Sequence, residues 1–169
     1  MTKTSGGIII AGFATCGKSM LGRKYKNVLD LESSVYRYKS YDNRLSVEQN
    51  KGTRREENGN WPQNYYDAIL EAVSNYDIIL VQLKPEHFDY FDAHHIRYSI
   101  AYPDINNWDE VEKRCIERGN NAYYITRLKE VFRPYYEDAI RRKYERFYTI
   151  TSGRNLEDVL LADGIKLIN

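Results

Sequence analysis

The sequence is poor in the residues and patterns that build metal centres, disulfide frameworks, membrane spans and nucleic-acid surfaces. Its 169 residues include two cysteines, Cys16 and Cys115, without metal-ligand spacing, so a reducing, cytosolic setting is the default expectation. The three histidines, His87, His94 and His95, lack a partner pattern, and we expect them on the surface or internally satisfied. No long apolar segment indicates a secretory signal or a membrane span. A formal net charge of +1 gives no reason to expect a strongly basic surface, so nucleic acid is not a favoured partner.

Tyrosine, by contrast, is abundant, with 16 copies in the chain. Aromatic side chains mostly bury area, so we expect most of these tyrosines to fill the core or cover the surface. A second interpretation is that some line a pocket, where flat rings can stack on a base. The length is most simply that of one domain, spanning residues 1–169, with a sizeable core.

One stretch carries a specific chemical pattern. From Gly12 to Ser19 the sequence reads GFATCGKS and matches G-x-x-x-x-G-K-[ST], the phosphate-binding loop. The β-branched run 8–11 before it is typical of a buried parallel strand, and Lys18 can open a helix after it. Glycines let successive N–H groups curl into an anion site at a helix N-terminus. A plain glycine turn would not explain a lysine and a hydroxyl placed together at the helix start.

The loop predicts ATP and Mg²⁺ as cofactors. Lys18 should reach the β- and γ-phosphates, and the Ser19 hydroxyl should ligate Mg²⁺. The other residues expected to bind the cofactor belong to the same turn and helix start: Gly12, Thr15, Cys16, Gly17 and Met20.

Two carboxylates lie at the end of a second predicted strand, residues 27–31. Asp30 and Glu32 occupy alternate positions, so both can face the phosphates at the carboxyl end of the sheet. One could hold the Mg²⁺ water shell, and the other could accept a proton from a substrate hydroxyl. A third predicted strand ends in Gln82 rather than an acid, which favours Asp30 for the metal-related role. The alternative is a solvated acidic turn, with a serine capping the next helix.

Two further segments have the character of lids. The polar segment 36–60 has few apolar residues at any period, and a long polar insertion beside a phosphate site often binds substrate. The second segment, about 104–120, contains a predicted helix with Arg114 and Arg118 four residues apart on one face. These arginines could close over a transferred phosphoryl group, or form a solvated face in which Glu110 pairs with Arg114.

Strands and helical segments alternate along the chain, which predicts a three-layer α/β domain with a largely parallel five-stranded sheet. The predicted strands are residues 8–11, 27–31, 76–82, 97–102 and 147–151. Helical spacing continues from residue 121 to 147, and Pro134 should kink or split that helix.

Several short motifs together resemble a known class. They are GFATCGKS, the strand end DLESS at 30–34, NGNWPQNY at 58–65, and a Tyr-Pro pair followed by RCIERGN at 114–120. The chain resembles small P-loop nucleoside and nucleotide kinases and is similar to a phage and Firmicute group described as adenylate-kinase-like. The resemblance implies ATP-dependent phosphoryl transfer, with Mg²⁺, onto a nucleotide-like acceptor. It also implies that Asn58, Trp61 and Asn64 contribute to substrate binding and that Arg114 and Arg118 belong to a catalytic lid.

The leading expectation is therefore a kinase that transfers the γ-phosphoryl group of ATP to a nucleoside monophosphate or a related acceptor. Lys18, Asp30, Arg114 and Arg118 are the predicted catalytic residues. One alternative is transfer to another hydroxyl, such as a nucleic-acid end, which would need a basic track. The other is a non-catalytic switch in which residues 36–60 report the nucleotide state.

Overall fold

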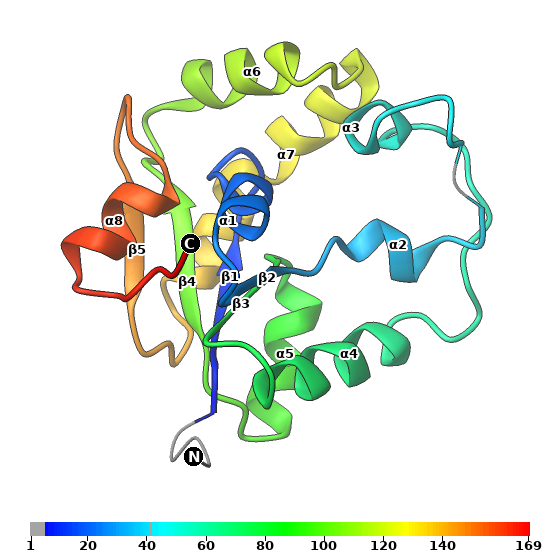
Figure 1. The fold of residues 1–169 in the computed structure, drawn as a ribbon. Coiled ribbons are helices and arrows are strands. Elements are labelled where there is room, and N and C mark those ends of the chain that lie inside the picture. Colours follow the sequence, from blue (N-terminus) through cyan, green and yellow to red (C-terminus); the bar gives the residue numbers. More distant parts are fainter. Residues whose placement is uncertain (1–5, 41) are drawn as a thin grey trace.

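A computed structural model of the protein describes residues 6–40 and 42–169. Its five strands form one parallel sheet in the order β2-β3-β1-β4-β5, which confirms the predicted sheet (Figure 1). The strands are β1 (Ile8–Gly12), β2 (Val28–Asp30), β3 (Ile78–Gln82), β4 (Ser99–Pro103) and β5 (Phe147–Ile150).

Eight helices in the described chain connect the strands. They are α1 (Lys18–Lys24), α2 (Ser33–Arg37), α3 (Val47–Asn50), α4 (Gln63–Val73), α5 (Pro85–Ala93), α6 (Trp108–Glu117), α7 (Ala122–Ala139) and α8 (Leu156–Ala162). Pro134 lies inside α7, so it does not split the helix as one interpretation of the sequence required. None of these helices is long and apolar enough to cross a membrane.

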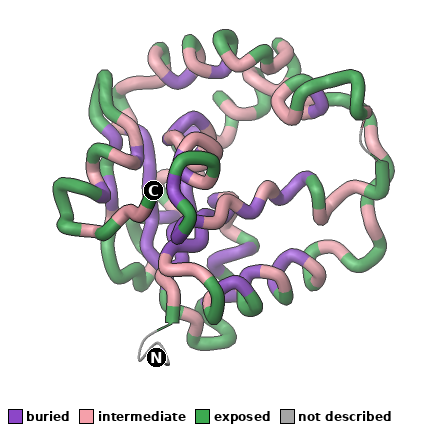
Figure 2. Tube along the Cα trace, viewed as in Figure 1, coloured by how far each residue is buried: buried purple, intermediate pink, exposed green. Residues whose placement is uncertain are grey.

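Two apolar cores lie on opposite faces of the sheet. Successive strand residues point to opposite faces, so Ile9 of β1 joins one core while Ile10 joins the other. The first core packs against α4, α5, α6 and α7, and the second packs against α1 and α8. Figure 2 shows the resulting pattern, with buried strands and helices exposed on their outer sides. This arrangement is the predicted three-layer α/β fold.

Many tyrosines fill the core, as expected. Tyr65, Tyr98 and Tyr102 are fully buried, and Tyr66 is nearly so. Their hydroxyls are satisfied inside the protein: the Tyr102 hydroxyl, for example, donates to the backbone oxygen of Phe132. Buried tyrosines therefore also fix the positions of neighbouring backbone segments.

The polar segment between α2 and α4 arches away from the sheet and lies beside the turn between α6 and α7 (Figure 1). Asn120 Nδ2 donates to the backbone oxygen of Glu48 at 3.0 Å, and Asn121 Nδ2 donates to that of Lys51 at 3.2 Å. A capping box at Ser46 begins the short helix α3 within it. The segment thus forms one wall of a cavity above the carboxyl ends of the strands.

Candidate functional site

The predicted phosphate loop connects β1 to α1. Gly17 has φ 103° and caps α1, and Thr15 also has a positive φ, of 67°. A Cβ on Gly12 would lie 2.8 Å from Cys16 Sγ and 3.1 Å from Lys18 Cδ, so a side chain there would obstruct the curl of the loop. The sequence therefore folds locally as the G-x-x-x-x-G-K-[ST] pattern requires.

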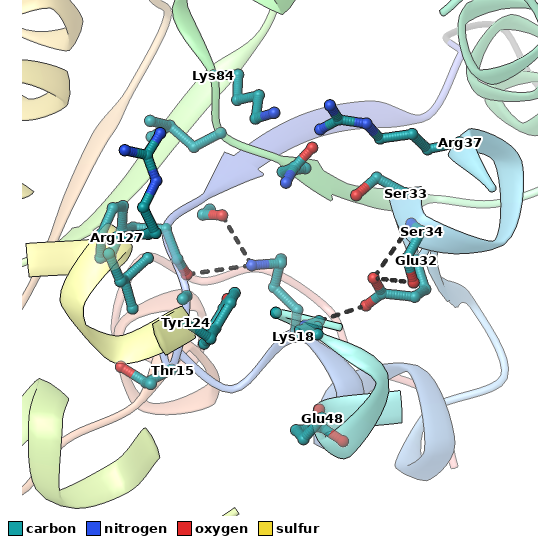
Figure 3. A pocket seen from close by; sticks show the side chains of 18 of the residues that line it. Thr15, Lys18, Glu32, Ser33, Ser34, Arg37, Glu48, Lys84, Tyr124 and Arg127 are labelled. Atoms are coloured by element: carbon teal, nitrogen blue, oxygen red, sulfur yellow. Dashed lines mark hydrogen bonds and ion pairs between the residues drawn. The ribbon is translucent and has the colours of Figure 1, made fainter. Parts of the chain in front are cut away.

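Lys18 crosses the mouth of this loop (Figure 3). Its ammonium group donates to the backbone oxygens of Gly12 at 2.7 Å and Phe13 at 3.1 Å. The same side chain lines a cavity of about 450 Å³ together with Ser19. The lysine is thus held at the boundary between the loop and the cavity.

The loop residues do not all face this cavity. Thr15 lines it and carries a buried hydroxyl without a hydrogen-bond partner in the described chain. Cys16 is 1% exposed and packs in the core beside α1 and α8, and Gly17 and Met20 are also outside the cavity lining. The Cys16 thiol therefore faces the core, and only its backbone belongs to the turn.

Asp30 reaches the cavity from the end of β2, beside the loop. Gly22 makes this approach possible, because a Cβ there would lie 2.8 Å from Asp30 Cβ. Burial raises the pKa of the Asp30 carboxyl, while the charge of Lys18 and a hydrogen bond from Ser19 act in the opposite direction. The structure brings Lys18, Ser19 and Asp30 together, as the sequence predicted.

Glu32 also lines the cavity, but it has a structural role as well. Its carboxylate caps α2 by accepting hydrogen bonds from Ser34, at 3.3 Å from N and 2.9 Å from Oγ. Lys51 Nζ lies 3.6 Å from the other carboxylate oxygen. Burial acts to raise the pKa of Glu32, but Lys51 and the Ser34 hydrogen bonds outweigh it and hold the pKa below its ordinary value. The alternative interpretation, in which a serine caps the next helix, is wrong about the capping residue, because Glu32 caps α2.

The two predicted lid arginines, Arg114 and Arg118, lie in different environments. Arg118 lines the cavity. Arg114 instead donates to the backbone oxygens of Thr15 at 3.1 Å and Arg154 at 2.7 Å, and it pairs with Glu110 at 2.8 Å. Arg114 lies outside the cavity lining and holds the phosphate loop against the turn after β5. One helical turn separates the residues, which is enough to place them in different environments.

Asn58, Trp61 and Asn64 are also outside the cavity lining. Asn64 Nδ2 donates to the backbone oxygen of Tyr36 at 2.8 Å, and Trp61 stacks on Tyr65 with ring centroids 5.4 Å apart. Asn58 Oδ1 accepts a hydrogen bond from the Asn60 backbone. These contacts support the segment between α2 and α4, and none of the three side chains lines the cavity.

The cavity is strongly basic, although the chain as a whole is nearly neutral. Seven basic and three acidic side chains line it: Lys18, Arg37, Lys51, Arg55, Lys84, Arg118 and Arg127, against Asp30, Glu32 and Glu48. Five of the basic residues come from segments that carry no motif of their own: Arg37, Lys51, Arg55, Lys84 and Arg127. The net charge of the whole chain gave no signal for this basic cavity, because acidic side chains elsewhere in the chain balance the total.

Three of these residues form a cationic wall, defined as Arg37, Arg55 and Lys84. Both guanidinium groups lie over the Tyr38 ring, with the Arg55 carbon 3.9 Å and the Arg37 carbon 5.3 Å from its centroid. Arg55 Nε and Nη1 are buried without a hydrogen-bond partner among the described residues. Burial and the charge of Arg37 lower the pKa of Lys84, and the two side chains extend toward one another in Figure 3. Arg37 also pairs with Glu57 at 3.0 Å, so an anionic ligand would mainly satisfy Arg55 and Lys84.

The cavity offers two oxygen side chains, Ser19 and Asp30, that could hold a magnesium ion. Within the described residues no group of three or more His, Cys, Asp or Glu side chains could hold a metal ion. Mg²⁺ commonly uses only one or two protein oxygens together with water and substrate phosphates. Ser19 and Asp30, which both line the cavity, match that requirement.

Comparisons with known proteins leave the family open. No family model matches the chain, and the search of curated proteins finds no match. Among solved structures, the chain is similar to a sulfotransferase from Alicyclobacillus acidocaldarius, with 12% identity and a TM-score of 0.42. The alignment covers 96% of this chain and 77% of that protein. A likeness this weak supports no inference about function.

Proposed function

We propose that the protein is an ATP-dependent phosphotransferase that acts on a nucleoside monophosphate or a related nucleotide-like acceptor. The observation that carries the proposal is the meeting of Lys18 and Ser19 of the phosphate loop with Asp30 in one cavity of about 450 Å³. Cavities of this size suit small-molecule ligands. Phosphoryl transfer needs mainly positioning and charge neutralisation, and this site supplies both.

ATP would supply the γ-phosphoryl group, and Mg²⁺ would neutralise charge on the phosphates. The loop N–H groups and Lys18 would bind the phosphate oxygens, while Ser19 and Asp30 would hold the metal. Arg118 lines the same cavity and would add positive charge near the transferred group.

The acceptor is inferred from the cationic wall. Arg55 and Lys84 have no carboxylate partner within salt-bridge distance among the described residues, so an acceptor with its own phosphate would complete their interactions. The phosphate of such an acceptor is largely ionised at neutral pH and needs orientation more than proton removal.

A screen for ADP release tests the proposal. The purified protein with MgATP would be offered nucleosides, nucleoside monophosphates and short oligonucleotides in separate reactions. We expect stimulation by one or more monophosphates and little by the matching nucleosides. Lys18→Ala should abolish the stimulation, whereas Lys26→Ala, at an exposed position next to β2, should retain it. ATP binding without stimulation by any acceptor would refute the kinase and favour a nucleotide-binding switch.

A further inference from the structure

A buried histidine lies directly behind the cavity. His87 of α5 is 2% exposed and is surrounded by the rings of Trp61, Tyr65 and Tyr66, with centroids 5.4–5.8 Å from its own. Both ring nitrogens have partners: Nδ1 lies 3.0 Å from the Tyr66 hydroxyl, and Nε2 lies 3.3 Å from Gln82 Oε1. Gln82 is the last residue of β3 and lines the cavity. A chain of hydrogen bonds therefore leads from α4 through His87 to the site.

The ring of His87 is neutral at physiological pH. Burial, together with the charges of Lys84 and Arg37, lowers its pKa to about 4. A neutral imidazole has one N–H donor and one acceptor nitrogen, so the two contacts must use opposite roles.

The neighbours of the Tyr66 hydroxyl decide which nitrogen carries the proton. This hydroxyl lies 3.0 Å from His87 Nδ1 but 3.5 Å from the backbone oxygen of Glu86, which is at the limit of a hydrogen bond. The shorter contact favours donation to Nδ1, which leaves the proton of His87 on Nε2, and Gln82 Oε1 opposite Nε2 agrees with this. Nε2–H then donates to Gln82 Oε1, and this bond sets the orientation of the carboxamide.

The NH₂ group of the Gln82 carboxamide is available to bind a ligand. No hydrogen bond from Gln82 Nε2 to any described residue is present, and this atom is not among the buried atoms that lack partners. Because Gln82 lines the cavity, its NH₂ group is exposed there. The Gln82 backbone N–H donates to the Tyr65 hydroxyl at 3.0 Å, and that hydroxyl donates to Leu31 O at 3.0 Å, so the strand end is fixed as well.

We propose that Gln82 is a specificity-determining residue of this site and that His87 is its positioning residue. His87 holds the Gln82 carboxamide so that its NH₂ group is presented to a hydrogen-bond-accepting atom of the acceptor substrate, such as a carbonyl oxygen or an unprotonated ring nitrogen. A substrate group that can only donate is disfavoured at the same point, because two donors would face each other. The proposal rests on the proposed function for the identity of the substrate, but the orientation of Gln82 does not depend on it.

Nuclear magnetic resonance tests the orientation without any turnover. Long-range ¹H–¹⁵N spectra of the protein at neutral pH should show His87 as the neutral form protonated on Nε2. Titration with nucleoside monophosphates should shift the side-chain NH₂ signals of Gln82. A proton on Nδ1, or NH₂ signals that do not move while other cavity residues respond, would overturn the proposal.

Kinetics with an acceptor found in the ADP-release screen test the specificity role. Gln82→Glu places an acceptor where the NH₂ group was, so the acceptor KM should rise at least tenfold while the ATP dissociation constant stays within twofold. His87→Phe should raise the same KM with a smaller change in kcat, and His87→Gln should recover part of the loss because its amide can donate at the position of Nε2. His94→Phe is the matched control, since His94 is exposed, follows the end of α5, and contacts Tyr90 of that helix by a hydrogen bond and by ring stacking that Phe can keep.

The outcomes separate the two proposals. If the kinase is active and Gln82→Glu leaves the acceptor KM unchanged, the specificity role of Gln82 is refuted while the proposed function stands. If no acceptor stimulates ADP release, the proposed function fails, and the position of the His87 proton and the response of the Gln82 NH₂ signals still decide this inference. If His87→Phe does not fold, the spectra of the unmodified protein and the Gln82→Glu measurement remain sufficient.

Discussion

Arg114→Ala should destabilise the protein, whereas Arg118→Ala should not. Arg114 donates to the backbone oxygens of Thr15 and Arg154, at 3.1 and 2.7 Å, and its side chain is only 26% exposed. Hydrogen bonds to a charged group contribute about 1.5–3 kcal/mol each, and a partly exposed i,i+4 ion pair adds about 0.3–0.5 kcal/mol. With the two backbone bonds at the lower end of that range, we expect a loss of about 3 kcal/mol.

Arg118 is the comparison residue one helical turn away. Its side chain lines the cavity and has no hydrogen bond or ion pair to a described residue, so its removal should change the free energy of unfolding by less than about 0.5 kcal/mol. Loss of its positive charge should instead lower kcat with the acceptor. The pair thus separates a residue that supports the loop from one that faces the ligand.

Urea unfolding followed by circular dichroism, and thermal melts, would measure both variants. For a domain of this size, about 3 kcal/mol corresponds to a fall in Tm of about 6–12 °C. Equal stabilities of the two variants, or an Arg114→Ala variant within about 0.5 kcal/mol of the unmodified protein, would refute the assignment of Arg114 to structural support.

Three further results are expected. Asp30→Asn should reduce single-turnover rates at saturating MgATP and acceptor more than Glu32→Gln does, and a larger rate loss from Glu32→Gln would reverse these roles. Asp30→Asn should also preserve or raise Tm, because burial opposes the charged form of Asp30. Because the pKa of Glu32 is lowered in the folded protein, its charge stabilises the fold above the ordinary pKa, and this contribution is lost as pH falls through the folded-state pKa. The loss of Tm caused by Glu32→Gln at pH 7 should therefore shrink in melts at acid pH. A constant difference in Tm between the two proteins would contradict this. Iodoacetamide should label buried Cys16 and Cys115 slowly in the folded protein and quickly in urea, and fast native labelling of Cys16, read by mass spectrometry, would argue against its place in the core.

Local patterns in the sequence determined much of the fold. The β-branched runs at β1 and β3 are buried on both faces, and such strands are typical of parallel sheets. The phosphate loop was also readable, because its glycines and its Lys18-Ser19 pair act through backbone geometry and neighbours close in sequence. The same is true of Asp30, which the strand-end rule places beside the loop.

Only the tertiary structure decided which arginine contacts the phosphate loop and where the Cys16 side chain lies. Arg114 and Arg118 share a helix face in sequence, but the backbone oxygens of Thr15 and Arg154 are available only to Arg114. Cys16 follows the loop pattern, yet its side chain turns into the core behind it.

Sequence patterns also could not predict the cationic wall or the contact between Gln82 and His87. Arg37, Arg55 and Lys84 are 18 and 29 residues apart along the chain. Arg37 ends α2, Arg55 lies between α2 and α4, and Lys84 follows β3, so only the tertiary fold brings them together. His87 has no motif, because its role depends on the desolvation and the contacts that packing against α4 creates. Hydrogen bonds and charge interactions act over a few ångströms in space, so their partners are set by how distant segments pack rather than by spacing along the chain.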